Sequence, residues 1–574
     1  MKNWQTVTYD EELTDALHAE TGLARPACAV LSGRGHASAE LIDAWLNPRL
    51  SKLSDPFLLP DMDAAVARIK QAVAADETIL VYGDYDVDGI TSTALLLGVL
   101  KSLGARVIPF LPHRVDDGYG LSVETVQRCI EEHRPGCIIT VDCGTSSVEA
   151  VEVAREAGVD VVVTDHHEPD EQIAAACAVV NPKRNGGDDP LRHLAGVGVA
   201  FKVCHALLKT LRDENHDGAG AIDLKQYLDY VAVGTIADMV SLSEENRIFA
   251  RHGLRILNQT DRPGFLALKQ VAGIKTPMDA YHVGFLLGPR LNAAGRLGTA
   301  LTALELLQSR DADRSSVIAK ELNAANRERQ EVESRMVDEA MADIDRWFDA
   351  GQHYAVVAAR RGWHPGVIGI VASRLCVRYS RPAIVIAVDD AGVGRGSCRS
   401  VGPFNMVEGL TNCADLLQRY GGHAMAAGLQ VDEKQIEAFR ERFSDTVKHR
   451  VQMEALRPEQ RIDAWISLRE ADWPLLECLD RMAPFGLGNP KPVWGVKGAR
   501  LVGTPRVVGK KHLKMTVLDG NTRLDAIAFG MGEREIPDGL IDIAFQLNRN
   551  TYMNRESIQM TVKDFRASST DASG

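Results

Sequence analysis

The stretch "TILVYGDYDVDGITSTALLLGVLKSLG" (residues 78–104) decides the fold class. Its first half is a short apolar run rich in β-branched residues, which is typical of a buried strand, and its second half predicts a helix. Three aspartates, Asp84, Asp86 and Asp88, stand at alternate positions between the two halves. Carboxylates this close repel one another and raise one another's pKa unless a cation neutralises them. The stretch therefore predicts a strand that ends at a cation site.

The spacing of these aspartates also matches the opening of an EF-hand calcium loop. Such a loop needs a bidentate glutamate at its twelfth position, but the twelfth residue counted from Asp84 is Leu95. An EF-hand is entered from a helix, whereas a strand is predicted before Asp84. The pattern instead favours the edge of an open α/β sheet where its strands end, because ligands bind there.

Length and composition limit the class of protein. The 574 residues allow three or four domains of about 150 residues each. No apolar run approaches the ~20 residues of a membrane helix, and the start of the chain does not resemble a signal peptide, so we expect a cytoplasmic protein without a membrane partner. Ten cysteines without a C-x-x-C pair indicate neither a disulfide framework nor a thiolate zinc site.

The formal net charge of -13 argues against unspecific binding to polyanions, but it does not exclude local basic patches. Two such patches exist. Residues 491–517 contain seven Lys or Arg and no acid, and residues 354–388 contain five Arg and no acid. A solvated charged surface is the plain alternative for either patch.

The order of apolar patterns predicts a multidomain α/β protein. Strands alternate with helices from residue 76, which predicts a doubly wound parallel sheet, and the apolar periodicity is helical from Leu194 to about Thr276. We expect residues 76–310 to form one domain and the helical leader, residues 1–75, to pack on it. Residues 311–350 lack Gly and Pro and predict one long helix of about 50 Å between two lobes. Residues 351–455 predict a smaller α/β domain. Residues 456–574 alternate short β-runs with turns, which predicts a small β-barrel of the OB-fold type.

Acids and histidines follow several of the predicted strands. The ends of parallel strands share one edge of a sheet, and an apolar helical run before Asp238 would bring this residue alongside. A single aspartate at a strand end is more often an N-cap or a turn residue, but the joint occurrence favours a metal site. Carboxylates with an imidazole suit Mn²⁺ or Mg²⁺, and two ions about 3.5 to 4 Å apart can act on a phosphoester. The residues at the strand ends are Asp84, Asp86, Asp88, Asp142, Asp165, His166 and His167.

At this point the chain resembles a known family. The motifs "DYDVDG", "VDCG", "DHH" and "GTIADMV", in this order, resemble those of the DHH phosphoesterases, and "GGHAMAAG" (421–428) resembles the hallmark of their DHHA1 domain. The long helix, "GPRLNAAGRLG" (288–298) and "PFGLGNPKPVW" (484–494) are similar to the family's single-strand-specific exonucleases. The resemblance begins near residue 45. It implies degradation of single-stranded DNA from the 5′ end to 5′-mononucleotides, in DNA recombination and repair.

The resemblance also implies a ligand set for two Mn²⁺ or Mg²⁺ ions. Asp142 would bridge the ions, and water would attack phosphorus in line. Asp142, Asp86 and His167 are the implied catalytic residues. His167 would lie near the scissile phosphate, or alternatively would orient a metal ligand. One ion would be held by Asp88, Asp142, His166 and Asp238, and the other by Asp84, Asp86 and Asp142.

Two further groups of residues are candidates for holding the strand. A site for the terminal phosphate would explain the direction of degradation, because arginine and backbone N–H groups both suit phosphate oxygens. Each of these residues could instead be structural, in a salt bridge or a tight turn. The candidates are Arg114, Arg296, Ser397, Arg399 and His423. In the barrel, the residues expected to follow the DNA backbone are Arg506, Lys510, Lys511 and Lys514, with Trp494 and His512 as rings for base stacking.

Two other functions fit part of the pattern. A DHH hydrolase of short oligonucleotides or other small phosphoesters would need only the two α/β lobes, so the barrel argues against it. A catalytically silent scaffold would be expected to lack some ligands, whereas every motif acid is present. For the exonuclease, the expected partners are single-stranded DNA, a single-strand-binding protein and a helicase, and we expect a monomer.

Overall fold

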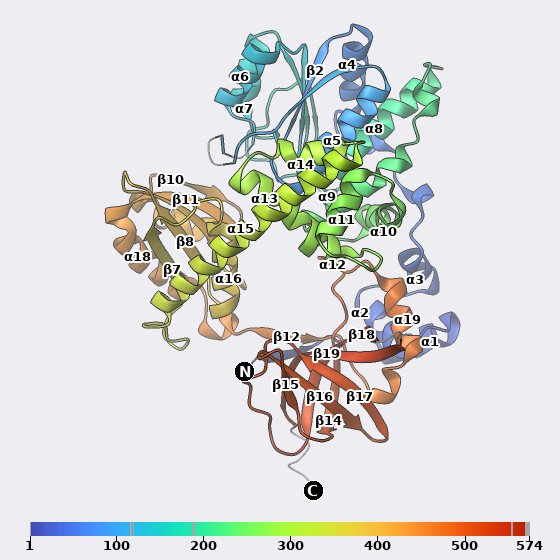
Figure 1. Cartoon of the computed structure of the whole chain (residues 1–574), viewed down its shortest axis with the longest axis vertical. Helices are drawn as coiled ribbons and strands as arrows, with labels where there is room; N and C mark the ends of the chain where they lie inside the picture. Colours follow the sequence, from blue (N-terminus) through green and yellow to red (C-terminus); the bar gives the residue numbers. More distant parts are fainter. Residues whose placement is uncertain (1, 115–116, 119, 186–189, 553–554, 569–574) are drawn as a thin grey trace. The chain divides into compact units, whose positions relative to one another are not determined.

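Two units make up the chain in the computed structural model, which describes residues 2–114, 117–118, 120–185, 190–552 and 555–568 (Figure 1). The barrel unit contains residues 1–49, 457–485 and 489–574. The α/β unit contains residues 50–456 and 486–488.

A parallel five-stranded sheet forms the first part of the α/β unit. Its strand order is β3-β2-β4-β5-β6, and all four neighbouring pairs are parallel. The strands are β2 (Thr78–Gly83), β3 (Arg106–Phe110), β4 (Cys137–Val141), β5 (Asp160–Thr164) and β6 (Ala178–Val180). The helices around it are α4 (Met62–Ala74), α5 (Val87–Ser102), α6 (Val123–His133), α7 (Val148–Glu156) and α8 (Gly196–Asp213).

Both faces of this sheet are covered by helices. Ile79 and Val81 of β2 belong to the core shared with α4, α5 and α8, whereas Leu80 and Tyr82 belong to the core shared with α6 and α7. Figure 1 shows α6 and α7 together at this sheet. Side chains alternate between the faces of a strand, so a continuous apolar run serves both cores. The predicted doubly wound parallel sheet is confirmed.

Helices continue the α/β unit after this sheet. They are α9 (Leu228–Ala237), α10 (Glu244–Gln259), α11 (Pro263–Val271), α12 (Ala280–His282), a π-helical turn (Val283–Leu287), α13 (Gly288–Leu297) and α14 (Leu301–Gln308). The long helix expected at 311–350 is α15 (Ala312–Ile344), which Asp311 caps by accepting from the N–H groups of Asp313 and Arg314. Its length corresponds to about 50 Å. It packs against α11, α13 and α14 and also against α16 (Ile368–Tyr379).

A second, mixed sheet completes the α/β unit. Its order is β10-β11-β9-β8-β7; β7 and β8 are parallel and the other pairs antiparallel. Its strands are β7 (Val356–Arg361), β8 (Ala383–Val388), β9 (Val393–Arg399), β10 (Arg419–Gly422) and β11 (Ala426–Asp432). Residues of α15 and α16 share one core with this sheet, and residues of α17 (Met406–Thr411) and α18 (Ile436–Arg450) share another.

The barrel predicted near the end of the chain is also present. Its strand order is β13-β14-β18-β19-β17-β16-β15, and a further pairing between β14 and β16 closes the sheet on itself. Its elements are β13 (Ala464–Trp465), α19 (Trp473–Met482), β14 (Trp494–Leu501), β15 (Arg506–Val508), β16 (His512–Asp519), β17 (Thr522–Ala528), β18 (Ile541–Tyr552) and β19 (Arg555–Ala567).

The predicted packing of the leader, residues 1–75, is wrong for its first 49 residues. β1 (Asn3–Thr6) pairs in parallel with β12 (Glu459–Ile462), and α1 (Glu11–Thr21), α2 (Arg25–Gly33) and α3 (Ala39–Leu46) contribute to the barrel core around Trp494. The apolar face of a helix predicts that this face is buried, but it does not predict which domain covers it. The part of the leader that contains α4 belongs to the core of the parallel sheet.

Among the described residues, no helix combines the length and the apolar character that crossing a membrane requires. All ten cysteines are free, and nine of them are buried.

Candidate metal centre

The turn after β2 explains why a glycine follows the three aspartates. Asp86 is the N-cap of α5, and its Oδ1 accepts hydrogen bonds from the N–H groups of Asp88 (2.9 Å) and Gly89 (3.1 Å). A Cβ at Gly89 would lie 2.4 Å from the carbonyl oxygen of Asp84. Glycine thus lets the first turn of α5 pack directly on the strand end, which points the aspartates to one edge.

The structure brings all six predicted metal ligands together. Nε2 of His166 lies 3.1 Å from Oδ1 of Asp142, 3.6 Å from Oδ2 of Asp238 and 3.9 Å from Oδ2 of Asp88. Asp238 reaches this edge because it is the C-cap of α9. Three overlapping groups have ligand atoms within 4.8 Å of one another: Asp142, His166 and His167; Asp88, His166 and Asp238; and Asp84, Asp86 and Asp142.

The N-terminus of α8 holds one of these carboxylates in place. Asp88 accepts from the N–H groups of Gly196 (2.7 Å) and Val197 (2.9 Å). A Cβ at Gly196 would lie 2.8 Å from Oδ1 of Asp142, and a Cβ at Gly234 would lie 2.8 Å from Oδ1 of Asp88. Both glycines leave room for the carboxylates. Sequence reasoning missed Gly196, although the run "AGVG" before a helix is a usable signal.

Burial and mutual repulsion dominate the electrostatics of this cluster. Burial, followed by the neighbouring carboxylates, raises the pKa of Asp84, Asp88 and Asp142 well above their usual range. The same causes raise the pKa of Asp238 to about 7, and burial lowers the pKa of His166 to about 3. A cluster of buried acids with a neutral imidazole is costly unless a cation neutralises it.

The donor atoms also fit divalent cations. Oδ1 of Asp84, Oδ1 of Asp142 and Nε2 of His166 are buried without a hydrogen-bond partner. Buried polar atoms are normally paired, so unpaired ones that converge indicate a missing partner. Several carboxylates and one imidazole are the ligand type of Mn²⁺ and Mg²⁺.

Asp165 has a different role from the other strand-end acids. It accepts hydrogen bonds from the N–H groups of Thr145 (3.0 Å) and His166 (2.7 Å), and Oδ1 lies 2.8 Å from Nδ1 of His167. Burial favours its neutral form, but the hydrogen bond and charge of His167 outweigh burial and depress the pKa of Asp165. Burial likewise opposes protonation of His167, yet Asp165 raises the pKa of His167. Asp165 therefore orients His167 and favours its cationic form.

Asn181 is a further supporting residue that sequence reasoning missed. Its side-chain amide donates to the carbonyl oxygen of His167 (2.9 Å) and to Oγ1 of Thr145 (2.9 Å). It follows β6, the next strand of the sheet. Its position right after a strand, before a proline, is the signal that could have found it.

Three of the predicted phosphate-binding residues form a cationic cluster, named here the arginine trio: Arg114, Arg296 and Arg399. Burial lowers the pKa of Arg296 to about 9 and also lowers that of Arg399, and the charge of Arg114 acts in the same direction on both. The charge of Asp86 acts on Arg296 in the opposite sense. Among the described residues, no carboxylate forms an ion pair with any of the three. The trio is thus a set of poorly compensated cations beside the metal centre.

Neutral groups fix the geometry of the trio. Nη1 of Arg296 donates to the carbonyl oxygen of Gly366 (2.9 Å), and the guanidinium of Arg114 lies 4.9 Å from the ring centroid of Tyr85. Nη1 of Arg399 donates to Oγ of Ser397 (3.1 Å). Ser397 thus belongs to the same cluster.

The fifth predicted phosphate-binding residue, His423, precedes β11, and Ala426 of β11 pairs in register with Arg399 of β9. It stands in the hairpin between β10 and β11, where its N–H donates to the carbonyl oxygen of Ala426 (2.8 Å), and its side chain is exposed. Within the described part of the chain, no hydrogen bond or ion pair connects it with the trio.

The predicted basic surface of the barrel is present, but its aromatic residues differ from the prediction. Trp494 is fully buried and offers no ring for stacking. Phe529 instead is 56% exposed and contacts His512 edge-to-face, with ring centroids 5.1 Å apart. Phe529 escaped sequence reasoning because a phenylalanine after a β-run predicts a core residue. The cations around it are Arg506, Lys510 and Lys511, which are exposed, and Lys514, which is half-buried.

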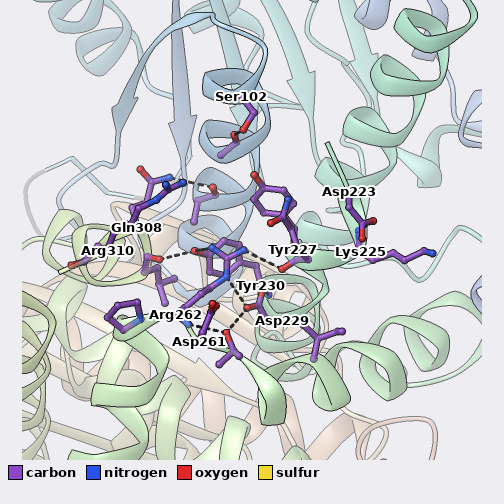
Figure 2. A pocket seen from close by; sticks show the side chains of 18 of the residues that line it. Ser102, Asp223, Lys225, Tyr227, Asp229, Tyr230, Asp261, Arg262, Gln308 and Arg310 are labelled. Atoms are coloured by element: carbon purple, nitrogen blue, oxygen red, sulfur yellow. Dashed lines mark hydrogen bonds and ion pairs between the residues drawn. The ribbon is translucent and has the colours of Figure 1, made fainter. Parts of the chain in front are cut away.

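A separate hollow of about 1060 Å³ lies among α5, α9, α10, α11 and α14, and none of the metal ligands lines it (Figure 2). Arg262 lies 4.4 Å from the ring centroid of Tyr230 and donates to Oδ2 of Asp229 at 2.8 Å (Figure 2). The guanidinium of Arg262 is thus bound by side chains of the protein itself. These contacts anchor the first turn of α9, the helix that ends at Asp238.

Comparisons with known proteins agree with this arrangement. The model of the DHH family, N-terminal domain, matches residues 78–235, that of the DHHA1 domain matches 351–449, and that of the RecJ OB domain matches 462–564. The single-stranded-DNA-specific exonuclease RecJ of Bacillus subtilis is 37% identical over 98% of this chain and 70% of its own length. RecJ of Escherichia coli K12 is 37% identical over 88% of this chain and 90% of its own.

Solved structures show the same fold. The crystal structure of RecJ in complex with Mn²⁺ from Thermus thermophilus superposes with a TM-score of 0.84 at 30% identity, over 98% of this chain and 79% of that one. The corresponding complex with Mg²⁺ superposes with a TM-score of 0.78 at 29% identity, over 98% and 78% of the two chains. By its sequence and its fold, the chain belongs to the RecJ family of single-stranded-DNA-specific exonucleases within the DHH phosphoesterases.

Proposed function

We propose that the chain is a metal-dependent exonuclease that hydrolyses single-stranded DNA from the 5′ end to 5′-mononucleotides, in DNA recombination and repair. One observation carries the proposal: overlapping groups of buried metal-type ligands lie beside the arginine trio, a set of poorly compensated cations. The ligand groups suit the hydrolysis of a phosphoester, and the arginine trio suits the binding of a terminal phosphate. Membership of the RecJ family supports the same substrate.

In this proposal two Mn²⁺ or Mg²⁺ ions are held by the six clustered ligands. Asp142 would be shared by both ions, because it belongs to the group with Asp84 and Asp86 and also to a group with His166. Asp88, His166 and Asp238 complete the second set. Two divalent ions held there would supply Lewis-acid activation of water and of the phosphate. Asp142 and Asp86 are the proposed catalytic carboxylates.

His167 acts on the phosphate in this proposal. Asp165 keeps its ring oriented and favours the imidazolium form. An imidazolium at this position attracts a phosphate oxygen. This role fits better than that of a ligand, because a ligating imidazole must be neutral, whereas Asp165 raises the pKa of His167.

The arginine trio with Ser397 binds the 5′-terminal phosphate in this proposal. An arginine whose pKa is lowered by burial gains most from an anion that replaces its lost hydration. The charge of Asp86 acts on Arg296, so a terminal phosphate held by the trio would lie on the Asp86 side of the metal centre. His423, in the hairpin next to the strand that pairs with β9, is proposed to contribute to the same phosphate contact.

The basic surface of the barrel holds the strand beyond the cut site, and its contribution can be measured through salt. Neutralising its four cations in the variant Arg506→Gln, Lys510→Gln, Lys511→Gln, Lys514→Gln should lower the slope of log Kd against log salt by about 3, at ~0.7 per phosphate contact on a single strand. Phe529→Ala should weaken binding without changing the slope, because stacking releases no counterions. Fluorescence anisotropy with a labelled 30-mer over a salt series measures both effects.

A matched control tests the assignment of this surface. The exposed Arg361 of β7, paired with Glu433, belongs to the α/β unit. Arg361→Gln should leave the slope unchanged. An unchanged slope in the fourfold variant would contradict the assignment of the barrel surface.

The proposal extends to assembly and partners. A monomer is the proposed state, because the candidate ligand groups need no residue from a second copy of the chain. A duplex must be opened before a single strand can enter such a site, so a helicase and a single-strand-binding protein are the proposed partner classes, and the cytoplasm is the proposed location.

A digest of labelled DNA tests the proposed function as a whole. With Mn²⁺, a 5′-labelled single strand should release labelled mononucleotide from the first cut, while its blunt duplex stays intact and chelator abolishes the reaction. A dinucleotide substrate serves as the comparison. Faster hydrolysis of the dinucleotide than of the long strand would favour a hydrolase of small phosphoesters instead.

A further inference from the structure

Gly486–Gly488, from the motif "PFGLGNPKPVW", lie apart from their neighbours in the sequence. The flanking residues 457–485 and 489–574 belong to the barrel unit, whereas these three residues belong to the α/β unit. The proposed function gives them no role. Three residues from the barrel's stretch of chain are nevertheless built into the unit that carries the metal centre.

These residues pack on the turn that follows a proposed metal ligand. The carbonyl oxygen of Leu487 accepts a hydrogen bond from the N–H of Leu242 at 2.8 Å. A Cβ at Gly488 would lie 1.9 Å from Oγ of Ser241, and a Cβ at Gly486 would lie 2.7 Å from Cδ1 of Leu242. Leu242 is buried in the main core of the α/β unit, so it cannot move away freely. Only glycines allow this approach of the backbone.

The turn, residues 239–243, starts directly after Asp238. Its first residue, Met239, has a positive φ of 62°, which a non-glycine residue adopts only when its surroundings impose it. On its other side, the side-chain amide of Asn246 donates to the carbonyl oxygen of Ser241 at 3.0 Å and also to that of His193. The turn is thus held from two sides, by Asn246 and by Leu487.

We propose that Gly486–Gly488 form a positioning element for the carboxylate of Asp238. This inference rests on the proposed function in one respect, namely that Asp238 is a metal ligand. Oδ2 of Asp238 lies 3.6 Å from Nε2 of His166. A metal site tolerates displacements of its ligands of only a few tenths of an ångström, ~0.2 Å in bond length. A shift of the turn therefore weakens metal binding before it affects the rest of the fold.

Gly488→Ala in the full chain tests the proposal. The added Cβ pushes Ser241 away, so Mn²⁺ affinity should fall by about 10- to 100-fold, as it does when groups that support ligands are changed. Titration followed by the electron paramagnetic resonance of free Mn²⁺ measures the affinity without turnover. In kinetics on a short single strand, the Mn²⁺ concentration for half-maximal rate should rise, whereas kcat at saturating Mn²⁺ should stay within about twofold.

Three further variants separate positioning from general damage. Gly503 has a φ of 71°, close to the 73° of Gly488, but open space around it, so Gly503→Ala is matched in backbone strain and should leave Mn²⁺ affinity unchanged. Ser241→Gly removes the atom that clashes, so Gly488→Ala combined with Ser241→Gly should regain most of the lost affinity. Gly486 does not have a positive φ, so Gly486→Ala adds a Cβ without backbone strain. If Gly488→Ala does not fold, Gly486→Ala should show the same loss of Mn²⁺ affinity.

Unchanged Mn²⁺ affinity in Gly488→Ala would overturn the inference, whether or not its unfolding temperature falls. Loss of affinity without recovery in the double variant would also overturn it. Failure of the proposed function would look different, because the wild-type chain would then bind no Mn²⁺ or would not hydrolyse the strand.

Discussion

Asp142→Ala should abolish hydrolysis of single-stranded DNA while leaving the chain folded and able to bind the strand. Asp142 belongs to two of the ligand groups, so in the proposed arrangement its removal would take a donor from each ion. Changes to groups that merely support metal ligands already cost 10- to 100-fold, and the loss here should exceed about 100-fold. Single-turnover hydrolysis of a 5′-labelled strand measures the rate, and anisotropy measures strand binding.

In the metal-free chain, Asp142→Ala should also reduce the loss of stability that occurs as pH rises, whereas ordinary damage to the core would only lower stability. Burial and the neighbouring acids raise the pKa of Asp142, and that of Asp238 to about 7. A carboxyl group whose pKa is higher in the folded chain than in the unfolded chain destabilises the metal-free fold as pH rises from about 4 towards 7. Without metal, Asp142→Ala should therefore lose less stability than the wild type as pH rises from about 4 towards 7. With Mn²⁺, the variant should gain less stability than the wild type.

Thermal unfolding with chelator and with Mn²⁺, over a pH series, measures these effects. Asp170→Ala, at an exposed aspartate just beyond the histidine pair, is the matched control and should behave like the wild type. Retained hydrolysis by Asp142→Ala would contradict the bridging role. Equal stabilisation by Mn²⁺ in the variant and the wild type would contradict the ligand assignment.

Arg399→Gln should slow the hydrolysis of 5′-phosphorylated strands by about 10- to 100-fold, because a hydrogen bond to a charged group contributes ~1.5–3 kcal/mol. Strands that begin with a 5′-hydroxyl should be affected much less, since they offer no terminal phosphate to the trio. The ratio of kcat/KM for the two substrates is therefore the measurement. In the wild type the ratio should favour the phosphorylated strand.

Arg361→Gln, at an exposed arginine of β7, provides the control for this prediction and should leave the ratio unchanged. Arg399→Lys should recover only part of the preference, because an ammonium cannot replace the planar fork of a guanidinium. An equal loss on phosphorylated and hydroxylated strands would mean that Arg399 supports the scissile group or the fold, and not the terminal phosphate.

Much of the centre could be predicted because local patterns determine it. Apolar runs that alternate with helices predict a parallel sheet, and parallel strands end at one edge, so acids that follow β2, β4 and β5 had to meet there. The supporting residues could not be predicted in the same way. Gly196 and Asn181 hold ligands through contacts with residues distant in the sequence, and no local period reports such contacts.

The wrong predictions also concern contacts between residues that are distant in the sequence. Trp494 was expected on the surface of the barrel, but it fills the barrel core, and Phe529 is exposed instead. α1 to α3 were expected on the parallel sheet, but they pack in the barrel unit. An apolar pattern shows that a face is buried, while the identity of its partner depends on which complementary faces the whole chain offers.

The sequence by itself determined the two α/β domains, the long helix, the barrel and the identity of the acids and histidines at the strand ends. Only the tertiary structure decided that Asp165 orients His167, that three arginines gather beside Asp86, and that Gly486–Gly488 join the α/β unit. Strand and helix patterns arise from interactions between residues close in the chain, whereas these arrangements depend on packing and on charges brought together across hundreds of residues.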